Sequence, residues 1–189
     1  MNNTELANPA PLGLAAFGMT TILLNLHNAG FFALDDVILS MGIFYGGITQ
    51  LLAGLLEYKK GNTFGLTAFA SYGSFWLTLV AILLMPKIGL TDAPDPGFLG
   101  IYLGLWGVFT LFMFFGTLKS ARMLQFVFLS LAVLFFLLAV GNIISSASVI
   151  HIAGWTGLVC GASAVCLAMG EVLNGQFGRT ILPVGEVRR

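Results

Sequence analysis

Long runs of apolar residues, separated by short polar breaks, dominate the chain. A window of about 19 residues, suited to membrane-crossing helices, finds six such runs near residues 9–30, 37–57, 63–85, 97–118, 122–143 and 149–172. An α-helix needs about 20 apolar residues to cross a hydrocarbon core about 30 Å thick. The pattern therefore predicts an all-α polytopic membrane protein, with six transmembrane helices forming a single domain over residues 1–189.

The polar breaks contain residues that start and stop helices. Asn8-Pro9 and Asp95-Pro96 each offer an N-cap followed by proline at the first helical position, and Asp35 precedes the second run. Pro86 follows the third run, where its missing N–H group ends a helix. These signals predict separate helices joined by short loops.

Composition narrows the range of functions. The 189 residues are 58% apolar, with 8 basic and 8 acidic residues and a formal net charge of zero. A chain without a basic cluster lacks the electrostatic footprint for nucleic acid, and no glycine-rich run ends in the Gly-Lys-Ser/Thr that binds a triphosphate. Cys160 and Cys166 lie in one apolar run and are predicted to be small buried hydrophobes. We expect the lipid bilayer as a partner, no nucleic acid, and no cofactor.

Basic residues are distributed very unevenly between the two sides of the predicted membrane domain. One side, which holds both termini, has seven of them: Lys59, Lys60, Lys119, Arg122, Arg179, Arg188 and Arg189. The other side has only Lys87, together with Asp35, Asp36, Asp92 and Asp95. Because basic loops stay on the cytoplasmic side, both termini are predicted to be cytoplasmic. The first helix should be retained, because Glu5 and no basic residue precedes it.

Ionisable residues are missing from the middle of every predicted span. Glu57 and Glu171 fall near the cytoplasmic ends, where we expect them to pair with nearby Lys or Arg, and His27 and His151 fall toward the opposite interface. The sequence contains no intramembrane carboxylate pair, no metal-ligand spacing and no Ser/His/Asp set at one depth. These features predict that the protein is not an enzyme and holds no metal.

Neutral polar residues do occur inside the spans. Hydroxyl and amide groups can replace part of the hydration shell of a small solute and still release it. We therefore name six candidate pathway-lining residues: Thr20, Asn25, Gln50, Ser71, Thr78 and Gln125. Four Gly-x-x-x-Gly pairs could also let helices approach closely, namely Gly42/Gly46, Gly61/Gly65, Gly100/Gly104 and Gly157/Gly161.

Two short motifs resemble a known family. The stretch Asn8-Pro9-Ala10-Pro11-Leu12-Gly13-Leu14 is similar to the NPAPLGL signature of the acetate uptake transporter family, and Ser71-Tyr72-Gly73-Ser74-Phe75-Trp76 resembles its motif in the third span. Length and span number fit its bacterial members over the whole chain. The resemblance implies uptake of acetate and, less efficiently, succinate across the bacterial inner membrane. It also implies a homohexamer in which each protomer has its own pathway.

The resemblance further implies a constriction formed by Phe17, Tyr72 and Leu131. Their positions provide an independent check, because each lies 8 or 9 residues after the start of a predicted span that begins on the cytoplasmic side. At 1.5 Å per residue this is roughly 12–14 Å, near the middle of the hydrocarbon core. We therefore expect the three side chains at one level, with Tyr72 able to donate a hydrogen bond to a carboxylate.

Other functions remain open from composition alone. A channel for a small neutral solute, such as an amide or ammonia, would suit the uncharged interior equally well. A non-transporting assembly or sensor subunit is a further alternative. The motifs also leave open whether acetate moves as an anion through a channel or together with a proton.

Overall fold

The computed structural model describes residues 6–186, which form helices and loops without any strand. The elements are α1 (Ala10–Asn28), α2 (Asp36–Met41), the π-helix η1 (Gly42–Thr49), α3 (Gln50–Lys59), α4 (Thr63–Leu84), α5 (Pro96–Gly116), α6 (Arg122–Ile143) and α7 (Ala147–Phe177). Glu5, on which the expected retention of the first helix rests, and Arg188 and Arg189, which belong to the seven basic residues of one side, lie outside the described residues.

Six helices in residues 6–186 are long and apolar enough to cross a membrane, which confirms the predicted fold class. The second of them, Asp36–Lys59, is continuous and combines α2, η1 and α3. Its π-helical turn was not predicted. The sixth, α7, continues to Phe177 and so extends five residues beyond the predicted end. It ends there because Gly178 adopts a left-handed conformation with φ 60°.

The helix starts use the predicted caps with one exception. Asp95 accepts a hydrogen bond from the Phe98 N–H at 2.8 Å, and Asp35 accepts one from the Val37 N–H at 3.1 Å. The N-cap assignment of Asn8 is wrong, because α1 begins at Ala10 with Pro9 in the cap position and no side-chain cap bond. Within the start of α1, Asn8 accepts a bond from the Ala10 N–H at 3.3 Å, and its side-chain amide also bonds to Glu171 and Lys60.

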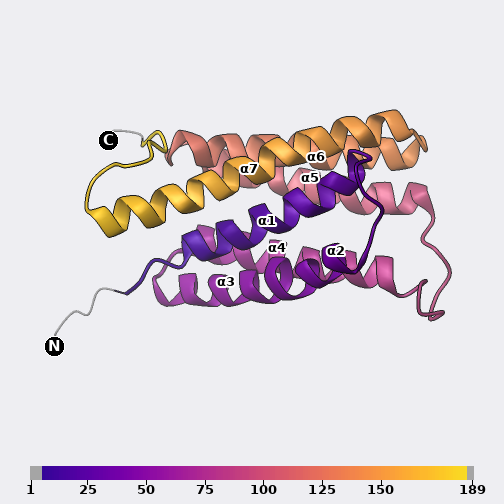
Figure 1. Ribbon diagram of the computed structural model, residues 1–189, viewed down its shortest axis with the longest axis horizontal. Helices are drawn as coiled ribbons and strands as arrows, with labels where there is room; N and C mark the ends of the chain where they lie inside the picture. Colours follow the sequence, from indigo (N-terminus) through magenta and orange to yellow (C-terminus); the bar gives the residue numbers. More distant parts are fainter. Residues whose placement is uncertain (1–5, 187–189) are drawn as a thin grey trace.

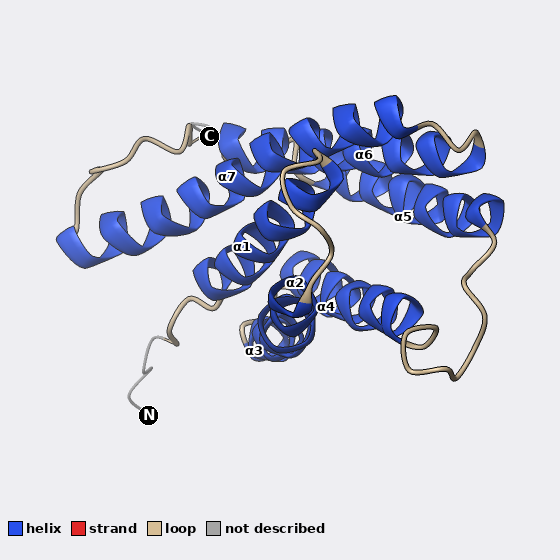
Figure 2. Cartoon of the chain, turned by 45° about the vertical axis from the view of Figure 1, so that its right-hand side comes forward, coloured by secondary structure: helices blue, strands red, loops and turns tan. Residues whose placement is uncertain are grey.

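The helices run along one long axis and form two unequal groups (Figure 1). In the larger group α5 packs on α6, α6 on α7 and α7 on α1, while in the smaller group α3 packs on α4. Figure 2 shows these groups as an upper and a lower set, and α1 joins them because it also contacts η1 and α3.

Both ends of the described chain lie at one end of the bundle, which we call the terminal end (Figure 1). The α3–α4 turn and the α5–α6 loop lie there too, so that Lys59, Lys60, Lys119, Arg122 and Arg179 gather at this end. Lys87 follows α4 at the opposite end. The charge asymmetry read from the sequence thus corresponds to two physical ends of the molecule.

The glycine pairs differ in what they pack against. A Cβ at Gly161 of α7 would lie 2.8 Å from the Gly18 carbonyl oxygen of α1, so this crossing needs glycine on both helices. Gly42 and Gly46 face Val80 and Trp76 of α4. Gly61 was wrongly interpreted as part of a helix face, because it occupies a turn at φ 70° with no other atom within 4 Å of its Cβ position.

Candidate functional site

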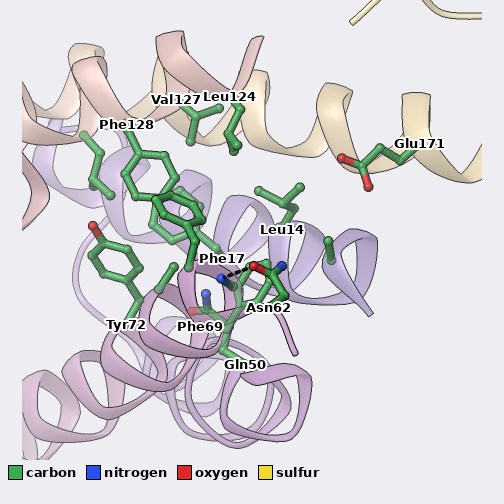
Figure 3. A pocket seen from close by; sticks show the side chains of 15 residues that line it. Leu14, Phe17, Gln50, Asn62, Phe69, Tyr72, Leu124, Val127, Phe128 and Glu171 are labelled. Carbon is green, nitrogen blue, oxygen red and sulfur yellow. Dashed lines mark hydrogen bonds between the residues drawn. The ribbon is translucent and has the colours of Figure 1, made fainter. Parts of the chain in front are cut away.

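A cavity of about 600 Å³, counted with its opening to solvent, lies between α1, α4 and α6. Each of these helices begins at the terminal end and turns one face to the cavity: Ala10, Leu14 and Phe17 on α1; Gly65, Ala68, Phe69 and Tyr72 on α4; and Leu124, Val127, Phe128 and Leu131 on α6. Three polar residues, Gln50, Asn62 and Glu171, also line it (Figure 3). The cavity is thus a mostly apolar funnel that enters the bundle from the terminal end.

The three residues predicted to form a constriction all line this cavity. Phe17, Tyr72 and Leu131 are buried members of one apolar cluster, and the ring centroids of Phe17 and Tyr72 are 6.0 Å apart. They are the cavity-lining residues furthest along their helices from the terminal end. They therefore occupy its closed end.

Phe128, which was not predicted as a site residue, also belongs to the closed end. Its ring centroid lies 6.1 Å from that of Tyr72, and Phe64 packs on it at 5.4 Å. Phe128 precedes Leu131 by three residues on α6, so both side chains share one helix face. The three-residue spacing from Leu131 could have suggested Phe128. In a helix that is apolar on every side, however, spacing alone does not identify the face that borders a cavity.

The Tyr72 hydroxyl already has a partner. It lies 3.0 Å from Thr110 Oγ1, and Thr110 donates its own proton to the Trp106 carbonyl oxygen at 2.7 Å. Because a threonine hydroxyl carries a single proton, Tyr72 is the donor in this pair. The expectation that Tyr72 is free to donate to a carboxylate is therefore wrong for this arrangement, and an uncommitted donor must come from another residue.

Gln50 offers such a donor. The residue is 0% exposed, and neither Nε2 nor Oε1 has a hydrogen-bond partner among the described residues. Gln50 begins α3 directly after the π-helical turn, and its side chain points into the cavity (Figure 3). Buried amides are almost always hydrogen-bonded, so this amide in the cavity wall is available to bond a polar solute or a water molecule that enters the cavity.

Hydrogen bonds link three segments of the chain around the mouth of the cavity. Asn8 donates to Glu171 Oε2 at 3.0 Å and accepts from Lys60 Nζ at 2.9 Å, so it connects α7 with the end of α3. Asn8, the first residue of the heptapeptide motif, therefore stabilises the mouth instead of capping a helix. Among residues 6–186, Glu171 is linked to the basic Lys60 through the Asn8 amide and not by a direct ion pair.

The expected pairing of Glu57 with a basic residue is wrong among the described residues. Glu57 is 0% exposed, and its Oε2 accepts a hydrogen bond from Asn62 Nδ2 at 2.7 Å. It turns inward because Gly65 leaves room, since a Cβ there would lie 2.9 Å from the Glu57 carboxyl carbon. Asn62 also accepts a bond from the Gly65 N–H, so its amide fixes both Glu57 and the start of α4.

The other candidate pathway residues are not brought to the cavity wall. Thr20 and Asn25 are buried on α1 beyond its closed end, and Ser71 is half-buried on α4. Thr78 is exposed and donates to the Ser74 carbonyl oxygen, while Gln125 donates to the Ser120 carbonyl oxygen in the α5–α6 loop. Gln50 is thus the one member of the predicted set that lines the described cavity.

Two further details concern the cysteines and histidines. Cys160 is buried as predicted, whereas Cys166 is exposed on the outer face of α7, so its predicted burial is wrong. His27 Nδ1 lies 2.9 Å from the Phe32 carbonyl oxygen beyond α1, and His151 is exposed near the start of α7. Residues 6–186 contain no group of three or more His, Cys, Asp or Glu side chains that could hold a metal ion.

Comparison with known proteins gives consistent matches. The chain is 80% identical over 186 residues to the succinate-acetate/proton symporter SatP of Escherichia coli K12, covering 98% of this chain and 99% of that protein. The solved structure of the bacterial acetate channel SatP matches with a TM-score of 0.95 and 80% identity, over 96% of this chain and all of that chain.

More distant relatives come from fungi. Acetate permease A of Emericella nidulans is 38% identical, over 96% of this chain and 67% of that protein. Ammonia transport outward protein 2 of Saccharomyces cerevisiae is 40% identical, over 82% of this chain and 57% of that protein. The model of the GPR1/FUN34/yaaH family matches residues 1–188. The resemblance read from the two motifs is confirmed, and the chain belongs to the GPR1/FUN34/yaaH family.

Proposed function

We propose that this protein takes up acetate and, less efficiently, succinate across the bacterial inner membrane through the cavity within each protomer. The observation that carries the proposal is the closed end of the cavity, where an uncommitted amide, Gln50, adjoins the apolar ring of Phe17, Tyr72 and Leu131. An amide can bind a carboxylate, and the ring fits a short apolar tail. The names of the bacterial relatives support this substrate class.

The chemistry of the substrate explains why a protein pathway is useful. A carboxylic acid with a pKa near that of glutamate, about 4.3, is only roughly one part in 500 neutral at pH 7. Passive crossing of the neutral acid is therefore slow at low external concentration. A path without fixed positive charge binds the anion weakly and releases it readily.

Orientation and assembly belong to the same proposal. Both termini face the cytoplasm, because the basic side chains at the terminal end belong on that side. The cavity then opens to the cytoplasm. The protomers form a homohexamer within the bilayer, and the exposed apolar side chains of α5, such as Phe98, Leu105 and Phe112, contact lipid or a neighbouring protomer.

Flux of labelled acetate into vesicles that contain only the purified protein tests this function. We expect initial rates well above those of protein-free vesicles, with succinate competing less effectively than acetate. A rate that follows membrane voltage without a pH gradient would indicate an anion channel, whereas a rate that requires the gradient would indicate symport. Acetate uptake equal to that of protein-free vesicles would contradict the proposal.

One relative supports a second candidate function. The yeast protein named for outward ammonia transport is 40% identical to this chain, and an uncharged, mostly apolar cavity also suits ammonia. The same vesicles distinguish the two candidates, since a pH-sensitive dye reports ammonia entry. Ammonia flux without acetate flux would favour the second candidate.

A further inference from the structure

Two buried N–H donors in the interior of the bundle have no partner among the described residues. They are Gln50 Nε2, at the closed end of the cavity, and Trp76 Nε1, on a residue that is 3% exposed. Building on the proposed function, we propose that these two donors bind the carboxylate of the substrate in succession as it crosses the ring of Phe17, Tyr72 and Leu131.

The positions of the two residues follow the path of the substrate. Trp76 comes four residues after Tyr72 on α4, so it lies on the same helix face one turn further from the terminal end. Thr20 continues α1 beyond Phe17 in the same way. Trp76 and Thr20 meet at Gly46, where a Cβ would lie 2.9 Å from Trp76 Cγ and 2.8 Å from Thr20 Cγ2. A polar layer therefore follows directly after the apolar ring.

The backbone places Gln50 one turn from this layer. Gly46 lies inside η1, which ends at Thr49. Gln50 is the first residue after η1 and follows Gly46 by four positions, about one helical turn. Single π-helical turns inside α-helices occur frequently at functional sites. The two donors thus lie on either side of the apolar ring of Phe17, Tyr72 and Leu131. Gln50 lies on the cavity side of this ring, and Trp76 lies one helical turn beyond the ring.

The chemistry of these groups favours a carboxylate. An indole Nε1 is a donor only, and a primary amide has two N–H groups, whereas the Tyr72 proton is held by Thr110. Hydrogen bonds to a charged group are stronger than those between neutral groups. Because neither donor is itself charged, each can release the anion to the next site.

Removing each donor without changing much volume tests this assignment. In Gln50→Met and Trp76→Phe we expect the KM for acetate uptake to rise by about tenfold or more, as for the loss of one hydrogen bond to a charged group. The midpoint of thermal unfolding should stay the same or rise, because an unsatisfied buried polar atom has been removed. A purely structural role predicts the reverse, a lower midpoint with unchanged KM.

Tyr102→Phe is the matched control. The Tyr102 hydroxyl is also buried without a partner among residues 6–186, but it lies on α5 outside the cavity wall. This variant should keep the wild-type KM. A wild-type KM in either Gln50→Met or Trp76→Phe would overturn the two-donor assignment while leaving the proposed function intact, because the wild-type flux is measured in the same experiment.

A second measurement needs no folded Gln50 variant. In wild-type protein labelled with ¹⁵N-tryptophan, acetate should shift one of the three indole N–H resonances, and equal concentrations of acetamide or chloride should shift it much less. Trp76→Phe identifies that resonance by removing it. Absence of any acetate-dependent shift would contradict binding at Trp76.

Discussion

Replacing Phe17 or Leu131 by alanine should relax the size limit of transport. Each change removes part of the apolar ring at the closed end of the cavity and so widens the opening. A larger acid then meets less steric resistance when it passes the ring. Discrimination by the shape of an apolar pocket is worth roughly tenfold or more for small differences in size. We therefore expect uptake of lactate and succinate relative to acetate to rise by about tenfold, measured as competitive uptake at matched membrane abundance.

A buried leucine outside the cavity provides the control for lost packing. Leu167→Ala on α7 removes a side chain that is 1% exposed and does not line the cavity. It should reduce stability by about 2–5 kcal/mol, as large-to-small core changes do, and leave the substrate ratios unchanged. If both ring variants keep the wild-type ratios, Phe17 and Leu131 do not form the constriction.

Replacing Gly161 by valine should prevent stable folding. A Cβ at this position would lie 2.8 Å from the Gly18 carbonyl oxygen, so α1 and α7 could no longer cross at their present distance. Overpacking of this kind costs about 1–3 kcal/mol, and more where backbone must move. We expect a large loss of monodisperse protein in size-exclusion chromatography after extraction from the membrane.

Gly104→Ala is the corresponding control within a helix. The nearest atom to a Cβ at Gly104 is Ala139 Cβ at 3.7 Å, an ordinary van der Waals distance. This variant should be recovered at wild-type levels. Equal recovery of Gly161→Val would mean that the α1–α7 crossing is looser than the structure indicates.

The helices were predictable because a membrane imposes one strong constraint. A chain cannot leave backbone groups unpaired in hydrocarbon, so each long apolar run had to form a helix. Once the helices were placed, the loops had to alternate between the two ends of the bundle, so the basic residues could be assigned to one end. Lys59 and Lys87 do lie at opposite ends. Phe17, Tyr72 and Leu131, which were expected at one level, do line one cavity, while their depth in the membrane and their role as a constriction stay predictions.

What the sequence could not predict was the direction in which side chains point. In helices that are apolar on every side, periodicity does not separate an inner face from a lipid face. Thr78 therefore was named and is exposed, whereas Phe128 was not named and borders the cavity. The inward turn of Glu57 depends on the absent side chain of Gly65 on another helix, a tertiary contact without a local signal.

The most direct test of the central claim places a removable block inside the cavity. Ala68 lies on the cavity wall of α4, one turn before Tyr72, and can be replaced by cysteine in a Cys166→Ala background, because Cys160 is fully buried. A bulky methanethiosulfonate reagent added from the terminal side should modify Ala68→Cys and stop nearly all acetate flux, and dithiothreitol should restore it. The same modification of Gln176→Cys, an exposed position at the end of α7, should leave the flux unchanged. Full acetate flux through completely modified Ala68→Cys protein would contradict passage of the substrate through this cavity.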